Sequence, residues 1–90
     1  MDEDWVGLRL DCRGARGVGK IVGVAGEWLV VRAGRLGRHT AVHGVDAVAG
    51  VGAVWVPYPR DLIRAAPRVE ARGELDEAAE RDLREHYGIS

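Results

Sequence analysis

The chain begins with apolar and polar residues in alternation, which predicts β-strands. Over residues 5–11, Val, Leu and Leu alternate with Gly, Arg and Asp, the period of two that gives a strand one buried face. A second Val-rich run spans residues 18–25, and the valines expected on one of its faces are Val18, Val22 and Val24. Residues 28–33 are apolar on both faces, which suits the centre of a sheet or a closed barrel.

Two further strands are weaker or shorter. Residues 38–45 form a weak strand, and residues 54–56 form a clear one that ends at Pro57 and Pro59, which cannot donate hydrogen bonds to a neighbour. Glycines in residues 12–17 predict a turn there. Strands that recur every 8 to 12 residues or so with short turns predict a small closed barrel. Closure would also remove exposed strand edges, which matters in so short a chain.

The last third of the chain predicts helices. Residues 59–66 can form one or two helical turns, which Pro67 stops. A longer helix is expected from Asp76, a good N-cap, to Tyr87, with Gly88 as the glycine that ends it. Its apolar stripe consists of Ala79, Leu83 and Tyr87. A helix this short is marginal alone, so we expect it to pack on the barrel or on a partner.

These patterns divide the chain into three parts. Its 90 residues, 47% of them apolar, suffice for one small domain with a single core. We expect a disordered acidic N-terminus over residues 1–4, a barrel-like domain over residues 5–69, and a C-terminal helical extension over residues 70–90.

Several short motifs occur in an order that resembles a known family. They are Val6-Gly7, Asp11, Gly14, Val18-Gly19-Lys20-Ile21-Val22, Glu27-Trp28-Leu29-Val30-Val31-Arg32, Val56-Pro57-Tyr58, Asp61, Ala66-Pro67 and Glu85-His86-Tyr87-Gly88. Together they resemble the PRC-barrel domain, which is named after the H subunit of the photosynthetic reaction centre and also occurs in a ribosome maturation factor. The tail is similar to that of a bacterial subgroup with a VPY…AP…HYG segment. The resemblance covers roughly residues 5–89.

The resemblance implies both a fold and a class of function. The implied fold is mainly β: a six-stranded antiparallel PRC-type barrel, followed by a short helical turn and a C-terminal α-helix. The implied role is a binding or adaptor module, with no enzymatic activity. Family membership does not fix the partner, because members bind very different ones.

Composition favours a cytoplasmic protein without membrane insertion. Cys12 is the single cysteine and cannot form an internal disulfide, which favours a reducing compartment. The longest uncharged run, residues 47–59, is 13 residues long and interrupted by glycines, too short to span a bilayer. The acidic start has the wrong sign for a signal peptide.

No motif for catalysis, a cofactor or a metal emerges from the sequence. Gly14–Lys20 fits a phosphate-binding loop only in outline, because Ile21 stands where the loop needs Ser or Thr and a strand follows in place of a helix. His39 and His43 lie about 13 Å apart on a strand, too far to share a metal. No serine or cysteine has a recognisable base or oxyanion motif around it.

Charge is distributed unevenly, although the total is only −1. Residues 1–27 carry −1, residues 28–72 carry +4 and residues 73–90 carry −4. One interpretation docks the acidic tail helix on the basic middle, within one chain or across a homodimer. The other makes the middle a surface for phosphates.

Two hypotheses of function follow. The first is a protein-binding adaptor that forms a homodimer, with contact residues Trp55, Tyr58, Leu83 and Tyr87. The second is an RNA- or ribosome-associated module that uses Arg32, Arg35 and Arg38. The near-neutral total charge and the lack of an aromatic RNA-binding signature favour the first.

Overall fold

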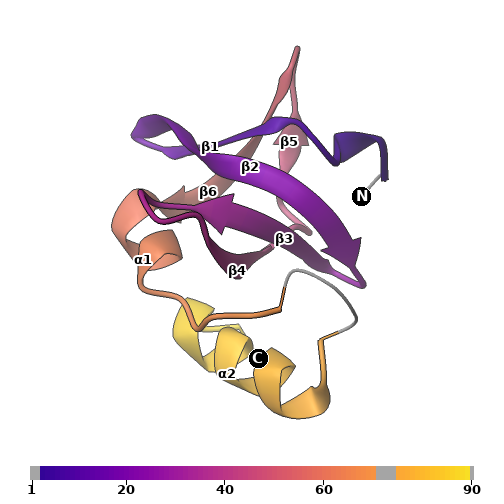
Figure 1. Ribbon diagram of the computed structural model, residues 1–90, viewed down its shortest axis with the longest axis vertical. Helices are drawn as coiled ribbons and strands as arrows, with labels where there is room; N and C mark the ends of the chain where they lie inside the picture. Colours follow the sequence, from indigo (N-terminus) through magenta and orange to yellow (C-terminus); the bar gives the residue numbers. More distant parts are fainter. Residues whose placement is uncertain (1–2, 71–74, 90) are drawn as a thin grey trace.

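A curved six-stranded sheet, two helices and a short N-terminal turn make up the computed structural model, which describes residues 3–70 and 75–89 (Figure 1). The elements in chain order are the 3-10 helix η1 (Glu3–Trp5), β1 (Arg9–Arg13), β2 (Ala15–Ala25), β3 (Trp28–Ala33), β4 (Arg38–His43), β5 (Val48–Ala49), β6 (Ala53–Pro59), α1 (Arg60–Arg64) and α2 (Glu77–Tyr87). The fold is therefore mainly β with a C-terminal helix, as expected. No helix in the described ranges is both long and apolar enough to span a membrane.

The sheet is mixed and open, whereas the sequence predicted an antiparallel closed barrel. Its strand order is β4-β3-β2-β1-β6-β5, and every neighbouring pair is antiparallel except β1 with β6. Residues 44–47 carry the chain from one edge of the sheet to the other, so β4 and β5 run in the same direction without pairing. Since β6 then forms a hairpin with β5, it returns parallel to β1.

Strand boundaries agree with the sequence in the middle of the chain and differ near its start. The predicted strand over residues 28–33 is confirmed as β3. The turn predicted over residues 12–17 is present but shorter than expected: Gly14, with φ of 82°, makes a tight turn between β1 and β2, and the rest of the segment is strand. Residues 3 and 4, expected to be disordered, lie in η1, while residues 1 and 2 fall outside the described part. The short strand β5 had no counterpart among the sequence predictions.

The core lies between the inner face of the sheet and the two helices. Cross-strand neighbours on this face are both buried, for example Leu29 beside Val42 and Leu10 beside Val54. Trp28, at the start of β3, is only 2% exposed. The other core side chains include Cys12, Val18, Ile21, Val31, Val56, Ile63, Leu83 and Tyr87. Every long strand thus contributes apolar side chains to one core.

A β-bulge in β2 changes the face that the sequence predicted. The register with β3 shifts between Ile21 and Gly23. Val18 and Ile21 are buried, whereas Val22 and Val24 are only partly so. The extra residue in the bulge reverses the alternation, so Val18, Val22 and Val24 do not share one buried face.

Helix α2 has the ends that the sequence predicted. The Asp76 carboxylate accepts a hydrogen bond from the Ala79 amide at 2.7 Å, and Gly88 ends the helix with φ of 70°. Leu83 and Tyr87 face the core, and the Tyr87 hydroxyl donates a hydrogen bond to the Ala41 carbonyl at 2.8 Å. The described part of the C-terminal extension therefore packs on the sheet of its own chain.

The two edges of the sheet differ in how they are covered. The chain after α1 runs along β4, where the Val69 amide donates to the His39 carbonyl at 3.1 Å and the Thr40 hydroxyl donates to the Pro67 carbonyl at 2.8 Å. At the opposite edge, β5 pairs only with β6 within the described part of the chain. The edge formed by β4 is therefore covered by the chain that follows α1, whereas the edge formed by β5 is open.

Gly19 provides a test of how closely β2 and β3 pack. A Cβ atom at this position would lie 2.5 Å from the Arg32 carbonyl oxygen, which is backbone and cannot move aside easily. At Gly23, in the same strand, the nearest atom would be 3.8 Å away, an ordinary contact. We expect Gly19→Ala to lower the free energy of unfolding by about 1–3 kcal/mol and Gly23→Ala to change it by less than about 0.5 kcal/mol.

Urea unfolding followed by tryptophan fluorescence measures both variants. Equal stability of Gly19→Ala and the wild type would contradict the close approach of the two strands.

Candidate functional site

The outer face of the sheet carries basic side chains in one row across four strands. Arg9 is paired with Lys20, Lys20 with Arg32, and Arg32 with His39, so these four residues lie side by side on the same face. We call them the basic row. Adjacent strands are about 4.8 Å apart, which makes the row about 14 Å long from β1 to β4.

Two members of the basic row have no counter-charge among the described residues. Lys20 and Arg32 are exposed, and no carboxylate among the described residues forms an ion pair with either. Like charges directly opposite each other on neighbouring strands destabilise a sheet. An anionic partner would relieve this repulsion, so the row is a candidate binding surface.

Arg9 ends the row and is held in place by Asp11. Its guanidinium donates two hydrogen bonds to the Asp11 carboxylate, at 2.8 and 3.1 Å, and the Gly17 amide donates a third at 2.8 Å. The Arg9 hydrogen bond, followed by that from Gly17, lowers the pKa of Asp11. Asp11 therefore stays ionised and fixes the orientation of Arg9.

Exposed apolar side chains adjoin the basic row on the same face. Trp55 on β6 pairs with Asp11 on one side and with Val48 on the other. Trp55 is 39% exposed, Val48 is 59% exposed, and Val51 at the tip of the hairpin is fully exposed. We call these three residues the apolar corner. A hollow of about 330 Å³ lies between the apolar corner and the side chains of Arg9 and Arg16.

Only one of the four predicted protein-contact residues lies on this surface. Trp55 is exposed, but Leu83 and Tyr87 are buried at 0% and 8% exposure. Tyr58 is partly buried and packs its ring 4.9 Å from that of Tyr87. Since a partner could reach Leu83 and Tyr87 only by displacing α2, we assign both to the core.

The structure also separates the three predicted RNA-contact arginines. Arg32 belongs to the basic row on the outer face. Arg38 points to the opposite side of β4, where one guanidinium nitrogen donates to the Ala66 carbonyl at 3.3 Å. Arg35 and Arg38 line a different hollow, together with Arg64. The three arginines thus form no single patch.

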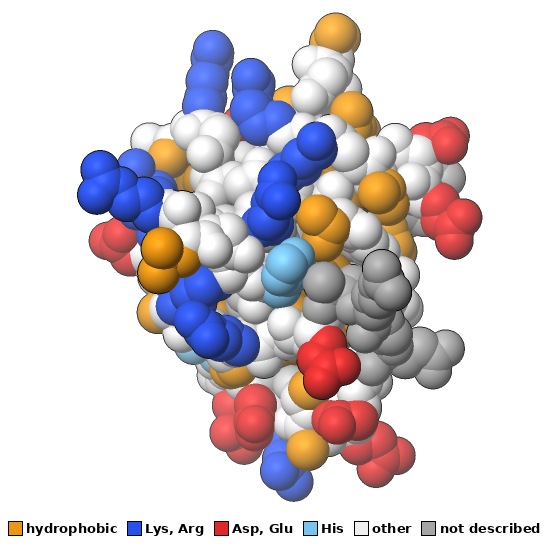
Figure 2. All heavy atoms as spheres, in the orientation of Figure 1, with side chains coloured by type: hydrophobic (Ala, Val, Ile, Leu, Met, Phe, Trp, Pro, Cys, Tyr) orange, Lys and Arg blue, Asp and Glu red, His pale blue; other side chains and the backbone are white. Residues whose placement is uncertain are grey.

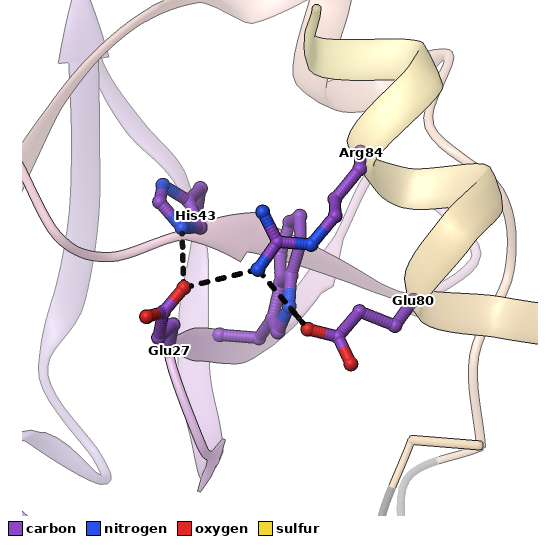
Figure 3. A network of polar contacts seen from close by, with 5 residues as sticks. Glu27, His43, Glu80 and Arg84 are labelled. Carbon is purple, nitrogen blue, oxygen red and sulfur yellow. Dashed lines mark hydrogen bonds and ion pairs between the residues drawn. The ribbon is translucent and has the colours of Figure 1, made fainter. Parts of the chain in front are cut away.

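A polar network fastens α2 to the sheet (Figure 3). Glu27, in the turn before β3, contacts the ring of His43 at 3.2 Å and the Arg84 guanidinium at 3.2 Å. Arg84 also donates to Glu80 at 3.3 Å, and the Trp28 indole donates to the same Glu80 oxygen at 3.4 Å. The network joins three elements and includes no nucleophile, so its role is structural.

Cys12 and the histidines offer no reactive or metal-binding centre in the described ranges. Burial raises the pKa of the Cys12 thiol, and the side chain is 2% exposed, which keeps it protonated and out of reach. No three His, Cys, Asp or Glu side chains in residues 3–70 and 75–89 are close enough together to hold a metal ion.

Comparison with protein-family models finds no match, and comparison with curated proteins finds none either. Function is therefore argued from the geometry. Sequence reasoning missed Arg9, Lys20 and His39 as site residues. Their alternation with apolar neighbours could have placed each on an outer face, but only the strand register aligns them in one row.

Glu27 should make stability depend on pH. The hydrogen bond with His43, together with the nearby charge of Arg84, lowers the pKa of Glu27. A carboxylate with a lowered pKa stabilises the fold above its unfolded pKa of about 4.3, and this contribution disappears as pH falls through the folded value. We expect Glu27→Gln to melt at a lower temperature than the wild type at pH 7, with the difference vanishing at acid pH.

Thermal unfolding followed by circular dichroism, from about pH 7 down to about pH 3, measures this difference. The exposed Glu70, substituted in the same way, serves as the control and should not change the pH dependence. A gap between Glu27→Gln and the wild type that persists at low pH would contradict the assignment.

Proposed function

We propose that this chain is a non-catalytic binding module of PRC-barrel type that acts in the cytoplasm. On this proposal, the six-stranded curved sheet is a variant of the PRC-type barrel. Its outer face holds a segment of a partner protein that carries both acidic and apolar side chains. The observation behind this proposal is that the basic row and the apolar corner lie on one face, beside the open edge of the sheet.

The chemistry of this face suits a protein partner. Tryptophan and arginine are the residues most often found at the energetic centres of protein interfaces. Trp55 and Val48 supply apolar area, while Lys20 and Arg32 supply cations that the described residues leave unpaired. A partner with acidic and apolar side chains would bind more tightly through both the apolar contacts and the ion pairs. The positive charge of the row would also raise its association rate.

Binding to the outer face can be tested by capture from a lysate of the native cells. We expect the wild type to retain one dominant protein with or without nuclease, and Trp55→Ala and the double variant Lys20→Glu, Arg32→Glu to lose it at least about tenfold. The control is Leu36→Ala, since Leu36 is 89% exposed but lies in the β3–β4 turn, away from Trp55. Quantitative mass spectrometry measures the retained protein.

Equal retention by all variants would exclude the outer face as the binding surface. A captured protein that Leu36→Ala loses as strongly as Trp55→Ala would likewise count against it.

The homodimer expected from the sequence is a separate prediction. Two copies joined through the apolar corner would bring their basic rows near each other, so salt should strengthen such a dimer by screening the repulsion. We expect sedimentation equilibrium to show more dimer at about 0.5 M salt than at about 0.05 M salt, and Trp55→Ala to abolish it. A monomer at all concentrations would contradict the homodimer.

A second candidate, binding of single-stranded RNA, has one observation in its favour. An exposed tryptophan beside a track of cations is the arrangement on which bases stack while phosphates bind alongside. RNA binding would weaken with salt at a slope in log K of about −0.7 for each phosphate contacted. Loss of the captured material on nuclease treatment would therefore favour RNA over an acidic protein.

A further inference from the structure

A second basic site lies on the other side of the β3–β4 hairpin from the basic row. The turn between these strands and the end of α1 enclose a pocket of about 380 Å³. Its lining residues are Ala33, Gly34, Arg35, Arg38, Thr40 and Arg64. Since side chains alternate along a strand, Arg38 and Thr40 face away from His39 and therefore away from the basic row.

Three arginines line this pocket, and its lining among the described residues includes no carboxylate. No described residue forms an ion pair with Arg35, Arg38 or Arg64. They come from two separate parts of the chain, the β3–β4 turn with the start of β4, and the end of α1. Three like charges brought together by tertiary folding repel one another, and an anion between them would reverse the sign of that energy.

Arg38 is held in position by the backbone and has an unused donor. One of its terminal nitrogens donates to the Ala66 carbonyl, at 3.3 Å. Its Nε is buried from solvent and has no hydrogen-bond partner in the part of the chain that the structure describes. A buried donor without an acceptor is costly and uncommon, so an acceptor from a ligand would stabilise this group.

The rest of the lining favours a small ligand with an anionic end. Thr40 uses its hydroxyl hydrogen on the Pro67 carbonyl and thereby positions the chain segment that holds Arg38. Gly34, with φ of 80°, has open space where a Cβ atom would stand. Small residues on one side and guanidinium groups on the other allow an oxyanion to approach closely.

We propose that this pocket binds the phosphate group of a small phosphate monoester. A doubly charged phosphate has three terminal oxygens, enough to contact each of Arg35, Arg38 and Arg64, whereas a carboxylate has two oxygens and one charge. The pocket is larger than a phosphate ion and lies within the range for small-molecule sites, so it leaves room for an organic part such as a sugar. This proposal does not depend on the function proposed for the outer face.

The test is binding of inorganic phosphate, ribose 5-phosphate and a mononucleotide by the full chain. Titration calorimetry and thermal shift should show saturable binding, with the monoesters binding more tightly than inorganic phosphate. We expect Arg35→Gln and Arg64→Gln, both at exposed positions, to weaken binding at least about tenfold each. Arg81→Gln, at an exposed position of α2 and outside both basic sites, is the matched control and should bind like the wild type.

Two comparisons separate this site from other anion effects. Sodium chloride at the same ionic strength should give no saturable shift, because it only screens charge. An oligonucleotide without terminal phosphate tests the alternative source of the same chemistry, the phosphodiester backbone, and we expect it to bind without competing with ribose 5-phosphate or not at all. Equal weakening by Arg81→Gln and Arg64→Gln, tight competition by the oligonucleotide, or no saturable binding of any phosphate would overturn the proposal.

Discussion

The attachment of β4 to the chain that follows α1 determines how the rest of the molecule is arranged. Three successive residues of β4 have partners there: His39 and Thr40 bond to residues 67–69, and the Ala41 carbonyl accepts from the Tyr87 hydroxyl. Two of these bonds, to the His39 and Ala41 carbonyls, satisfy backbone groups that an edge strand would otherwise expose. They also bring α2 onto the core and leave β5 as the open edge. The same attachment positions Arg38 through the Ala66 carbonyl, so the pocket beside the β3–β4 turn depends on it as well.

The near-zero net charge conceals a separation of charge in space. Figure 2 shows basic side chains gathered over the strands and α1, and acidic side chains mainly along α2 and toward the N-terminus. The acidic tail does meet the sheet, as one interpretation of the sequence proposed, but it does so mostly through apolar packing and the Glu27–Arg84 contact. Lys20 and Arg32 of the basic row take no part in these contacts and have no ion-pair partner among the described residues.

Local signals predicted those elements that local interactions specify. The N-cap at Asp76, the glycine after α2 and the apolar run of β3 each depend on a few neighbouring residues, and each was found. The direction of β6 depends on how residues 44–47 cross the sheet, which no local pattern encodes. The bulge in β2 shifts its register with β3 by one residue, and such a shift moves side chains to the other face. The alignment of Arg9, Lys20 and His39 with Arg32 in one row therefore could not be predicted from the sequence, although Arg32 itself was a candidate.

Residue type alone also could not separate surface from core among the aromatic candidates. Trp55 and Tyr87 were both predicted as contact residues. Trp55 lies on β6, beside the open edge formed by β5, whereas Tyr87 is buried near the opposite edge, formed by β4. Arg32, Arg35 and Arg38 are close in sequence, but the reversal of the chain between β3 and β4 places Arg32 on one side of the hairpin and the other two on the opposite side. In both cases, tertiary structure assigns the roles.

The basic row and the arginine pocket both contain cations without an ion-pair partner among the described residues, and this has a thermodynamic consequence. A chain of 90 residues buries only a modest share of its surface, so its stability has little reserve against internal repulsion. Repulsion within each cluster lowers the free energy of unfolding of the free protein. Binding of an anion would raise it again, because a ligand that binds only the folded state stabilises that state. The repulsion within the basic row and within the arginine pocket therefore links the stability of this fold to the occupancy of its two sites. Arg32 and His39 of the basic row lie on one side of the β3–β4 hairpin, and the arginine pocket lies on the other side. An anion bound at either site would therefore stabilise the same two strands, β3 and β4.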